Sequence, residues 1–290
     1  MTVPVSKSHD HPCDVCGSDD AEEVEILRQY TGGEPIHTCR QCGFVYVRRR
    51  RSAAAIAAVW SDELFGSHYT ARKPYAVARQ VFLAEILDSE LGLQDAQLCD
   101  IGAGEGEFLT LARDRYGATV FGVEPSATNC GLMRDAGISC FNGTAEQMAA
   151  SGERTGQFDI VTMMWTLENC ESPQALMMTA RELLKPEGHV LLATGSRILV
   201  PFKKPLHLYI SPGPPADTHA FRFSANTQRG LLAGCGYEVT FTNRYVDHDV
   251  LCMIGKRRSR SEAIPWEGDN YRAVIDFFER WHSETETYYR

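Results

Sequence analysis

The sequence predicts an α/β fold in which helices cover both faces of a doubly wound, mostly parallel sheet. From residue 97 onward, short apolar runs typical of strands alternate with segments whose apolar residues recur at helical spacing. Strands that are separated by helices are joined by right-handed crossovers and build a parallel sheet. A glycine-rich turn follows the first of these strands, and a cysteine-rich segment precedes the whole region. The chain is therefore expected to hold one large α/β domain and a small N-terminal domain.

Composition narrows the class of protein further. A chain of 290 residues with 43% hydrophobic residues can form a real core, and its net charge of −9 argues against a polyanionic partner such as nucleic acid. No apolar run approaches the roughly 20 residues that a membrane helix needs, and the N-terminus lacks the apolar centre of a signal peptide. Ten cysteines in such a chain indicate reduced thiols and metal ligands. We expect a cytoplasmic protein with no membrane partner.

The predicted elements follow in order along the chain. An alanine-rich helix covers 52–60, and Pro74 begins a second helix that closes at Gly92. The apolar face expected for that second helix is Val77, Val81, Phe82, Ile86 and Leu87. Strands are expected at 97–101, 119–123, 138–141, 158–164 and 189–194, with helices at 106–116, 126–136 and 173–185. A helix at 224–234, strands at 237–242 and 250–255, and a tail helix at 271–282 complete the set.

Domain boundaries follow from these elements. The predicted domains are residues 1–50 (cysteine-rich), 51–95 (helical connector), 96–257 (α/β domain) and 258–290 (helical tail). One side of the tail helix is apolar, so we expect it to pack on the domain or on a second subunit, in which case the protein would be a homodimer.

Glycine occupies every second position after the first strand, at Gly102, Gly104 and Gly106, directly after Asp100. Only a residue without Cβ turns tightly with positive φ and lets a ligand touch the backbone. The turn leads into a helix whose free N–H groups are available to a ligand. The sequence therefore predicts a small-ligand site at this strand–turn–helix unit.

Acidic residues decide between two ligand classes at this turn. Glu105 and Glu107 flank the start of the helix, and they would repel the pyrophosphate of a dinucleotide. The G-x-G-x-G spacing also differs from the G-x-G-x-x-G of dinucleotide-binding domains. S-adenosylmethionine has no phosphate and carries a sulfonium and an ammonium group, so acidic surroundings suit it. The next strand ends in Glu124, 18 positions past Gly106, where a carboxylate can accept hydrogen bonds from ribose hydroxyls.

With these residues in view, the chain resembles the class I S-adenosylmethionine-dependent methyltransferases. The resemblance runs through five ordered blocks: 100–106, 122–126, 143–146, 158–161 and 184–192. It implies a Rossmann-like sheet of seven strands whose antiparallel edge is formed by the last two, and S-adenosylmethionine as the cofactor. The alternative is an NAD-binding domain of similar architecture.

The resemblance also implies roles for residues of the site. Asp100 would anchor the turn, and the backbone at Gly102 and Gly104 would hold the methionine moiety. The other implied cofactor residues are Glu124 and Pro125 at the ribose, Thr144, Ala145 and Glu146 at the adenine, and Met164, Trp165 and Tyr69 at the methionine end and the mouth of the site. In the resembling enzymes an aromatic residue in the position of Tyr69 covers the cofactor, although Tyr69 could equally well pack the connector.

Together with Tyr69, which is also a catalytic candidate, two further residues are candidates for the chemistry. Glu168 stands where resembling small-molecule enzymes commonly carry Leu-Glu-His, but here Asn169 replaces the histidine and cannot act as a base. This departure favours oxygen or nitrogen acceptors over carbon. A long proline-rich insertion at 195–223 is typical of a functional loop, and its His219 is a candidate general base because a histidine titrates near neutral pH. A structural role for His219 is the alternative.

Four cysteines near the N-terminus form two copies of C-x-x-C-G: Cys13 with Cys16, and Cys39 with Cys42. Two residues between thiolates allow both sulfurs to bind one tetrahedral ion, and a segment of about 50 residues needs such a staple to fold. The alternative, a redox C-x-x-C, requires a thioredoxin-like context that is absent here. The sequence predicts a structural zinc ribbon.

Together these features predict a methyltransferase that acts on O or N of a small polar metabolite, such as a sugar nucleotide or a natural-product precursor. The alternatives are a sugar C-methyltransferase, a non-catalytic binding module, and an RNA methyltransferase that grips phosphates with the zinc ribbon and Arg48–Arg51. Residues 1–75 carry nine basic and ten acidic side chains, and this balance argues against RNA.

Overall fold

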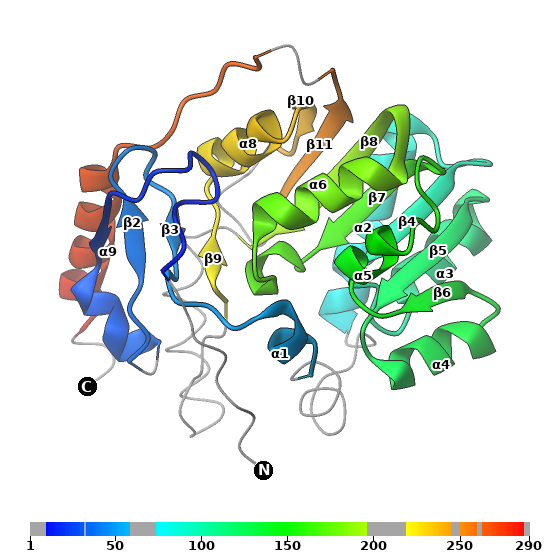
Figure 1. The fold of residues 1–290 in the computed structure, drawn as a ribbon, viewed down its shortest axis with the longest axis horizontal. Coiled ribbons are helices and arrows are strands. Elements are labelled where there is room, and N and C mark those ends of the chain that lie inside the picture. Colours follow the sequence, from blue (N-terminus) through cyan, green and yellow to red (C-terminus); the bar gives the residue numbers. More distant parts are fainter. Residues whose placement is uncertain are drawn as a thin grey trace.

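The computed structural model describes residues 10–31, 33–58, 74–195, 219–244, 250–259 and 263–286. These residues form two β-sheets that lie side by side, each with its own helices (Figure 1). The larger sheet has seven strands and the smaller has four.

The seven-stranded sheet has the order β10-β11-β8-β7-β4-β5-β6. Its strands are β4 (Gln97–Ile101), β5 (Thr119–Glu124), β6 (Ser139–Asn142), β7 (Phe158–Met164), β8 (Leu184–Thr194), β10 (Tyr237–Thr242) and β11 (Leu251–Arg257). Strands β4 to β8 pair in parallel, whereas β11 runs antiparallel to both of its neighbours. The predicted Rossmann-like sheet with an antiparallel edge is confirmed, and the carboxyl ends of its parallel strands share one edge.

Helices cover both faces of this sheet. The helices are α2 (Pro74–Leu91), α3 (Glu107–Tyr116), α4 (Ala127–Asp135), α5 (Ala145–Ala150), α6 (Pro173–Leu183) and α8 (Ala225–Gly234). One apolar cluster packs α2, α3 and α4 on one face, and another packs α5, α6 and α8 on the other. In α2 the expected apolar face is partly wrong: Leu83, Ala84 and Leu87 are fully buried, whereas Val77 and Phe82 are exposed.

The four-stranded sheet is antiparallel and has the order β1-β2-β3-β9. Its strands are β1 (Ala21–Glu23), β2 (His37–Cys39), β3 (Val45–Tyr46) and β9 (Phe221–Arg222). The first three come from the cysteine-rich segment, but β9 comes from the far end of the insertion after β8. A two-residue strand has no periodicity for the sequence to reveal, so this pairing was not expected. The small sheet therefore joins two segments that lie far apart in the chain.

Helices from both ends of the chain accompany the small sheet. The 3-10 helix η1 (Glu25–Tyr30) and the tail helix α9 (Tyr271–Thr285) pack together beside β2, at the end of the molecule opposite the large sheet (Figure 1). Their cluster includes Val274 and Phe278 of α9, and Trp281 is also buried. Helix α1 (Ala53–Ala58) follows the small sheet. The tail packs on the cysteine-rich segment of its own chain.

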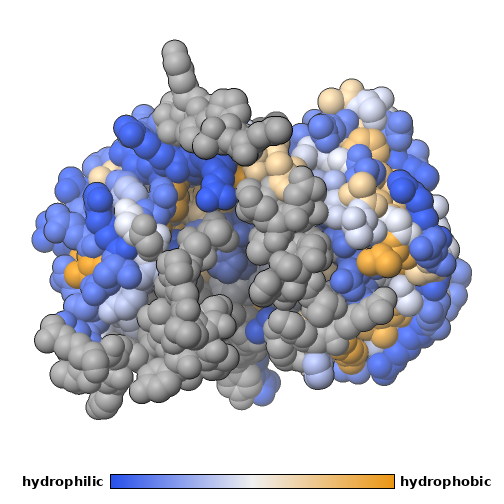
Figure 2. Space-filling view, turned by 90° about the horizontal axis from the view of Figure 1, so that it is seen from below, coloured by the Kyte–Doolittle hydropathy of each residue, from blue (hydrophilic) through white to orange (hydrophobic). Residues whose placement is uncertain are grey.

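On the face shown in Figure 2, hydrophilic residues cover most of the described surface of the small-sheet half, and small hydrophobic groups are scattered over the large-sheet half. Within the described ranges, none of the helices has the length and apolar character that crossing a bilayer requires.

A buried ion pair links the two halves. The side chains of Arg50 and Asp14 are 1% and 6% exposed, and Nη2 of Arg50 lies 2.6 Å from Oδ2 of Asp14. The Arg50 guanidinium also donates to the carbonyl of Glu171 (2.8 Å) and lies 4.5 Å from the ring centre of Phe221. Ser172 donates its hydroxyl to Asp14 (3.1 Å). The start of α6 is thereby tied to the cysteine-rich segment.

Replacing Arg50 by alanine should leave Asp14 as a buried, poorly paired charge. We expect a loss of about 3–5 kcal/mol in the free energy of unfolding, measured by urea denaturation. The matched control is Arg49→Ala, whose partner Asp10 is exposed, and which should change stability very little. Equal losses in the two variants would contradict the role assigned to Arg50.

Candidate active site and metal centre

The glycine turn after β4 forms a tight corner against the end of β5. The N–H groups of Gly102 and Ala103 both donate to the carbonyl of Val123, at 2.8 and 3.2 Å. At Gly102, with φ of 79°, an added Cβ would lie 2.5 Å from Oγ1 of Thr166. At Gly104, with φ of 55°, an added Cβ would meet nothing within 4 Å. Packing thus requires the first glycine, while the second borders open space that a ligand can occupy.

Glu124, the last residue of β5, braces this corner. One carboxylate oxygen accepts the N–H of Gly104 and the other accepts the N–H of Ser126, both at 2.9 Å. Glu124 is only 4% exposed. Burial raises the pKa of its carboxyl group, and the two backbone hydrogen bonds oppose that shift. The carboxylate is held rigidly at the corner, and its remaining lone pairs suit ligand hydroxyls.

Asp100 lies beneath the same corner. It is 2% exposed and accepts a hydrogen bond from the hydroxyl of Thr162 (2.7 Å). Burial, together with the nearby Glu124 charge, raises its pKa to about 7, and the hydrogen bond from Thr162 opposes this shift. Two buried acids at one backbone corner favour a cationic ligand and disfavour a phosphate. This donor set fits the sulfonium and ammonium groups of S-adenosylmethionine.

The predicted adenine residues lie along the same edge of the sheet, because β6 pairs with β5. Thr144 caps α5: its hydroxyl accepts the N–H of Gln147 (3.3 Å), and the Gln147 side chain accepts the N–H of Thr144 (2.8 Å). Asn142 donates to the carbonyl of Pro125 (3.0 Å). Ala145 is buried. The segment from β6 into α5, which includes Glu146, is thereby fixed beside Glu124, and its contact with adenine stays a prediction.

Trp165 follows Met164 directly after β7 and has φ of 54°. A bulky residue in the left-handed region is strained, and such strain is often kept at ligand sites. Its N–H donates to the carbonyl of Ala193 (2.7 Å), and the Arg79 guanidinium of α2 lies 5.1 Å from the centre of its ring. Thr166 then donates its hydroxyl to the carbonyl of Ile101 (3.0 Å). The residues after β7 are thereby tied to the glycine corner.

The three catalytic candidates lie in different surroundings. Glu168 is 4% exposed and accepts the N–H of Gly195 (2.8 Å). His219 is exposed and lies two residues before β9 of the small sheet. Tyr69 and its neighbour His68 lie outside the described residues. The structure therefore gathers Asp100, Glu124 and the glycines at the corner, while the roles of the three candidates stay predictions.

Sequence reasoning missed four residues that shape this site. They are Ser126, Thr162, Thr166 and Arg79. Ser126 could have been identified from the sequence as the N-cap of α4. The other three act through contacts with residues far away in the chain, which no local sequence pattern reveals.

The four cysteines meet as predicted. The sulfurs of Cys13, Cys16, Cys39 and Cys42 all lie within 4.8 Å of one another. Two pairs, Cys13–Cys42 and Cys16–Cys39, are 3.5 Å apart, close to the separation of about 3.8 Å expected around tetrahedral zinc. Hydrogen bonds with Cys13 and Cys39 raise the pKa of Cys42 well above its usual range, and burial of the thiol adds a smaller increase. The cluster fits a cation that would replace the thiol protons.

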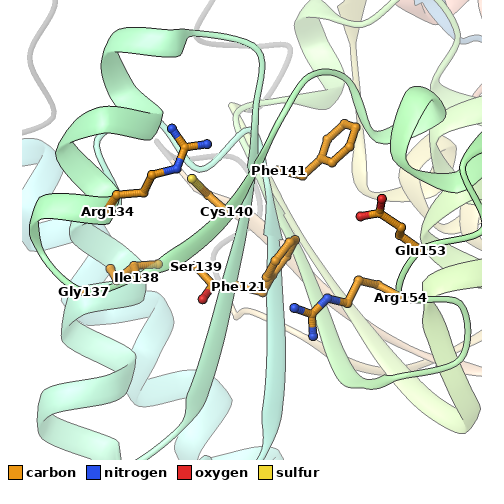
Figure 3. Close-up of a pocket in the computed structure, with 9 residues that line it drawn as sticks. All are labelled: Phe121, Arg134, Gly137, Ile138, Ser139, Cys140, Phe141, Glu153 and Arg154. Atoms are coloured by element: carbon orange, nitrogen blue, oxygen red, sulfur yellow. The ribbon is translucent and has the colours of Figure 1, made fainter.

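A hollow of about 480 Å³ lies at the edge strand β6 (Figure 3). Arg134 and Arg154 flank the strand on opposite sides, and the Arg154 guanidinium lies 4.6 Å from the ring centre of Phe121. The remaining residues around this hollow are Gly137, Ile138, Ser139, Cys140, Phe141 and Glu153. None of the predicted cofactor residues lines it, so we place the ligand site at the glycine corner.

The raised pKa of Asp100 predicts a pH dependence of stability. Its pKa is about 7 in the folded chain against a usual 3.8, so the folded state binds the proton more tightly than the unfolded state. The corresponding stability is complete below about pH 4 and is lost as the pH rises through about 7. Relative to Asp100→Asn, the original protein should lose roughly 1.4 kcal/mol per pH unit in this window. Urea unfolding between pH 5 and 8 checks this, and parallel profiles would contradict it.

Known structures share this fold. The 1,6-didemethyltoxoflavin-N1-methyltransferase of Burkholderia thailandensis, solved with 1,6-didemethyltoxoflavin and S-adenosylhomocysteine, matches with a TM-score of 0.56 at 16% identity, over 74% of this chain and 96% of that one. The magnesium protoporphyrin IX methyltransferase of Synechocystis PCC 6803 matches with a TM-score of 0.52 at 14% identity, over 71% and 99%. Likeness at this identity shows the fold alone.

Sequence relatives are closer but cover less. The ubiquinone biosynthesis O-methyltransferase of Cereibacter sphaeroides is 37% identical over 117 residues, which is 38% of this chain and 46% of that protein. The enzyme of the same name from Pseudomonas aeruginosa is 34% identical over 38% and 49%. The aligned part spans about half the length of these relatives. Residues 74–241 match the family described as "Methyltransferase domain", and the chain belongs to this family.

Proposed function

We propose that this methyltransferase modifies an oxygen or nitrogen atom of a small polar molecule, such as a sugar nucleotide or a natural-product precursor. The observation that carries the proposal is the corner at which buried Asp100 and Glu124 meet the backbone of Gly104. The relatives named O-methyltransferases support an oxygen acceptor. The acidic net charge of the chain supports a small molecule over a polyanion.

In this proposal the residues of the corner hold and orient the methyl donor. When bound, S-adenosylmethionine supplies a methyl group that is already activated by a positively charged sulfur. Glu124 would accept hydrogen bonds from the ribose hydroxyls, and Trp165 would form a wall beside the methionine end. His219 would remove the proton of the acceptor, and Tyr69 would cover the mouth. Because the methyl group is already activated, alignment supplies much of the rate gain.

The surroundings of Asn169 support an oxygen or nitrogen acceptor. Its amide nitrogen donates to the carbonyl of Trp165 (3.1 Å), so the side chain supports the turn after β7. An amide in this position offers no base for removing a proton from carbon. A sugar C-methyltransferase is therefore the weaker alternative.

The surroundings of Arg48–Arg51 speak against an RNA acceptor. Arg50 is buried in its ion pair with Asp14. Arg49 pairs with Asp10 at 2.9 Å, and Arg48 lies 3.9 Å from Asp19. Three of the four arginines thus already face carboxylates, which leaves little positive charge for a phosphate backbone.

We further propose that the cysteine cluster binds a structural zinc ion. The two C-x-x-C-G turns are alike: the N–H of Gly17 donates to the carbonyl of Cys13, and that of Gly43 donates to Cys39, at 2.7 and 2.8 Å. Both glycines have positive φ. Four thiolates close a tetrahedral site and leave no open position for chemistry.

A transfer assay tests the proposed activity. Tritiated-methyl S-adenosylmethionine is offered with phenolic acids, sugar nucleotides, primary amines and total RNA, and mass spectrometry identifies the product atom. We expect label in a small molecule, and none with Glu124→Ala, which removes the brace of the corner. The matched control is Glu182→Ala, at an exposed position of α6, which should stay active. Label found only in RNA would overturn the proposal.

Metal analysis tests the zinc site. We expect about one zinc per chain by mass spectrometry, and its loss in Cys39→Ser together with a lower melting temperature, since structural zinc contributes to folding. The control is Cys140→Ser, which lies outside the cluster and should keep its metal. The proposal would be contradicted if the purified protein contains no metal and a chelator leaves its melting temperature unchanged.

A further inference from the structure

The short 3-10 helix η3 (Leu167–Asn169) lies between the cofactor corner and the small sheet. On one side, Thr166 donates to the carbonyl of Ile101 and occupies the space where a Cβ on Gly102 would lie. On the other side, Glu171 accepts the N–H of Ala53 (2.7 Å). The helix is therefore fixed relative to both halves of the protein, and a group that binds to it acquires a defined position relative to the corner.

Glu168 of η3 binds two residues that the chain separates widely. Its side-chain oxygen Oε1 accepts the N–H of Gly195, and its main-chain carbonyl accepts the N–H of Ala220, both at 2.8 Å. Gly195 directly follows β8, and Ala220 directly precedes β9. These two residues flank positions 196–218, which lie outside the described residues. One glutamate thus holds the point where the chain leaves the large sheet and the point where it enters the small one.

The environment of Glu168 suits this anchoring better than proton transfer. The residue is 4% exposed, and its carboxylate is engaged with a main-chain N–H. A hydrogen bond from a main-chain amide to a charged acceptor is among the stronger ones in proteins. Removing the acceptor would leave the half-buried Gly195 N–H without this partner, at a cost that exceeds the loss of a fully exposed bond. Gly195 lies two residues after Ala193, whose carbonyl accepts the N–H of Trp165 (2.7 Å), so its placement matters for the methionine end of the corner, beside which an acceptor must lie.

We propose that Glu168 is a positioning residue for the acceptor side of this methyltransferase: it sets Gly195 and Ala220 at a fixed place beside the cofactor corner, and it does not serve as the base. The inference rests on the proposed function. The required property of the side chain is an oxygen that accepts the Gly195 N–H. Glutamine supplies such an oxygen without a negative charge or basicity.

Two substitutions separate positioning from base catalysis. Glu168→Gln keeps the accepting oxygen and removes the base, whereas Glu168→Ala removes both. With the acceptor that gives the highest turnover in the transfer assay, we expect Glu168→Gln to stay within roughly threefold of the original kcat/KM and Glu168→Ala to fall roughly tenfold or more, mainly through a higher KM for the acceptor. Calorimetry should find the same affinity for S-adenosylmethionine in both variants as in the original protein. This result would show that both variants are folded.

Hydrogen exchange gives a readout that needs no acceptor. In Glu168→Ala the peptide covering 190–195 should exchange faster than in the original protein, whereas 219–223, which the main-chain carbonyl of residue 168 still holds, should change less; Glu168→Gln and the surface control Glu182→Ala should match the original protein. If no acceptor is found, the proposed function fails and exchange alone still decides the anchoring. The proposal is overturned if Glu168→Gln is as inactive as Glu168→Ala, which would make the carboxylate a base, or if Glu168→Ala leaves both exchange and turnover unchanged.

Discussion

The site depends on the contact between the carboxylate of Glu124 and the N–H groups of Gly104 and Ser126. Strand β5 places Glu124 next to the glycine turn, because Asp100 of β4 pairs in register with Gly122 of β5. A turn of glycines would otherwise sample many conformations, since each glycine loses much backbone freedom on folding. The carboxylate selects one of them and gives the corner a negative character. One side chain thus fixes the shape of the corner and the charge that the corner presents to a ligand.

The two halves of the protein are joined by contacts of the residues that follow β7. The Arg50–Asp14 pair contacts Glu171 and Ser172, and Asp14 stands between the cysteines Cys13 and Cys16. The cysteine turn, the ion pair and η3 therefore form a continuous set of packed and hydrogen-bonded groups that reaches the corner through Thr166. This arrangement explains how a small lobe with its own sheet can influence the geometry of a cofactor site built on the other sheet. The small sheet also ends in β9, which the insertion supplies.

Patterns within the chain predicted the large sheet well, and they failed where distant segments meet. Alternating strands and helices, the glycine turn and the paired C-x-x-C motifs are local, and the strands they predicted appear within a few residues. The end of helix α6 differed, because β8 begins directly at Leu184. The predicted apolar face of α2 was partly wrong, because the helix is oriented so that Leu83 and Ala84 are buried against neighbours that the sequence does not identify. Strand β9, the Arg50–Asp14 pair and the bond from Glu168 to Gly195 all join residues whose pairing depends on the finished fold.

The same distinction separates the two kinds of acid at this site. Asp100 and Glu124 lie near the carboxyl ends of parallel strands, the edge of the sheet at which ligands bind in folds of this kind. Their importance could therefore be inferred from position alone. Glu168 also follows a strand, and the family resemblance implied a chemical role for it. Its carboxylate instead accepts a main-chain N–H from a residue beyond the next strand, and a buried carboxylate that is committed to such a bond stabilises a geometry at the expense of its availability to a substrate. Position at the edge of the sheet therefore identifies which residues belong to the site, whereas their hydrogen-bond partners determine what each one does there.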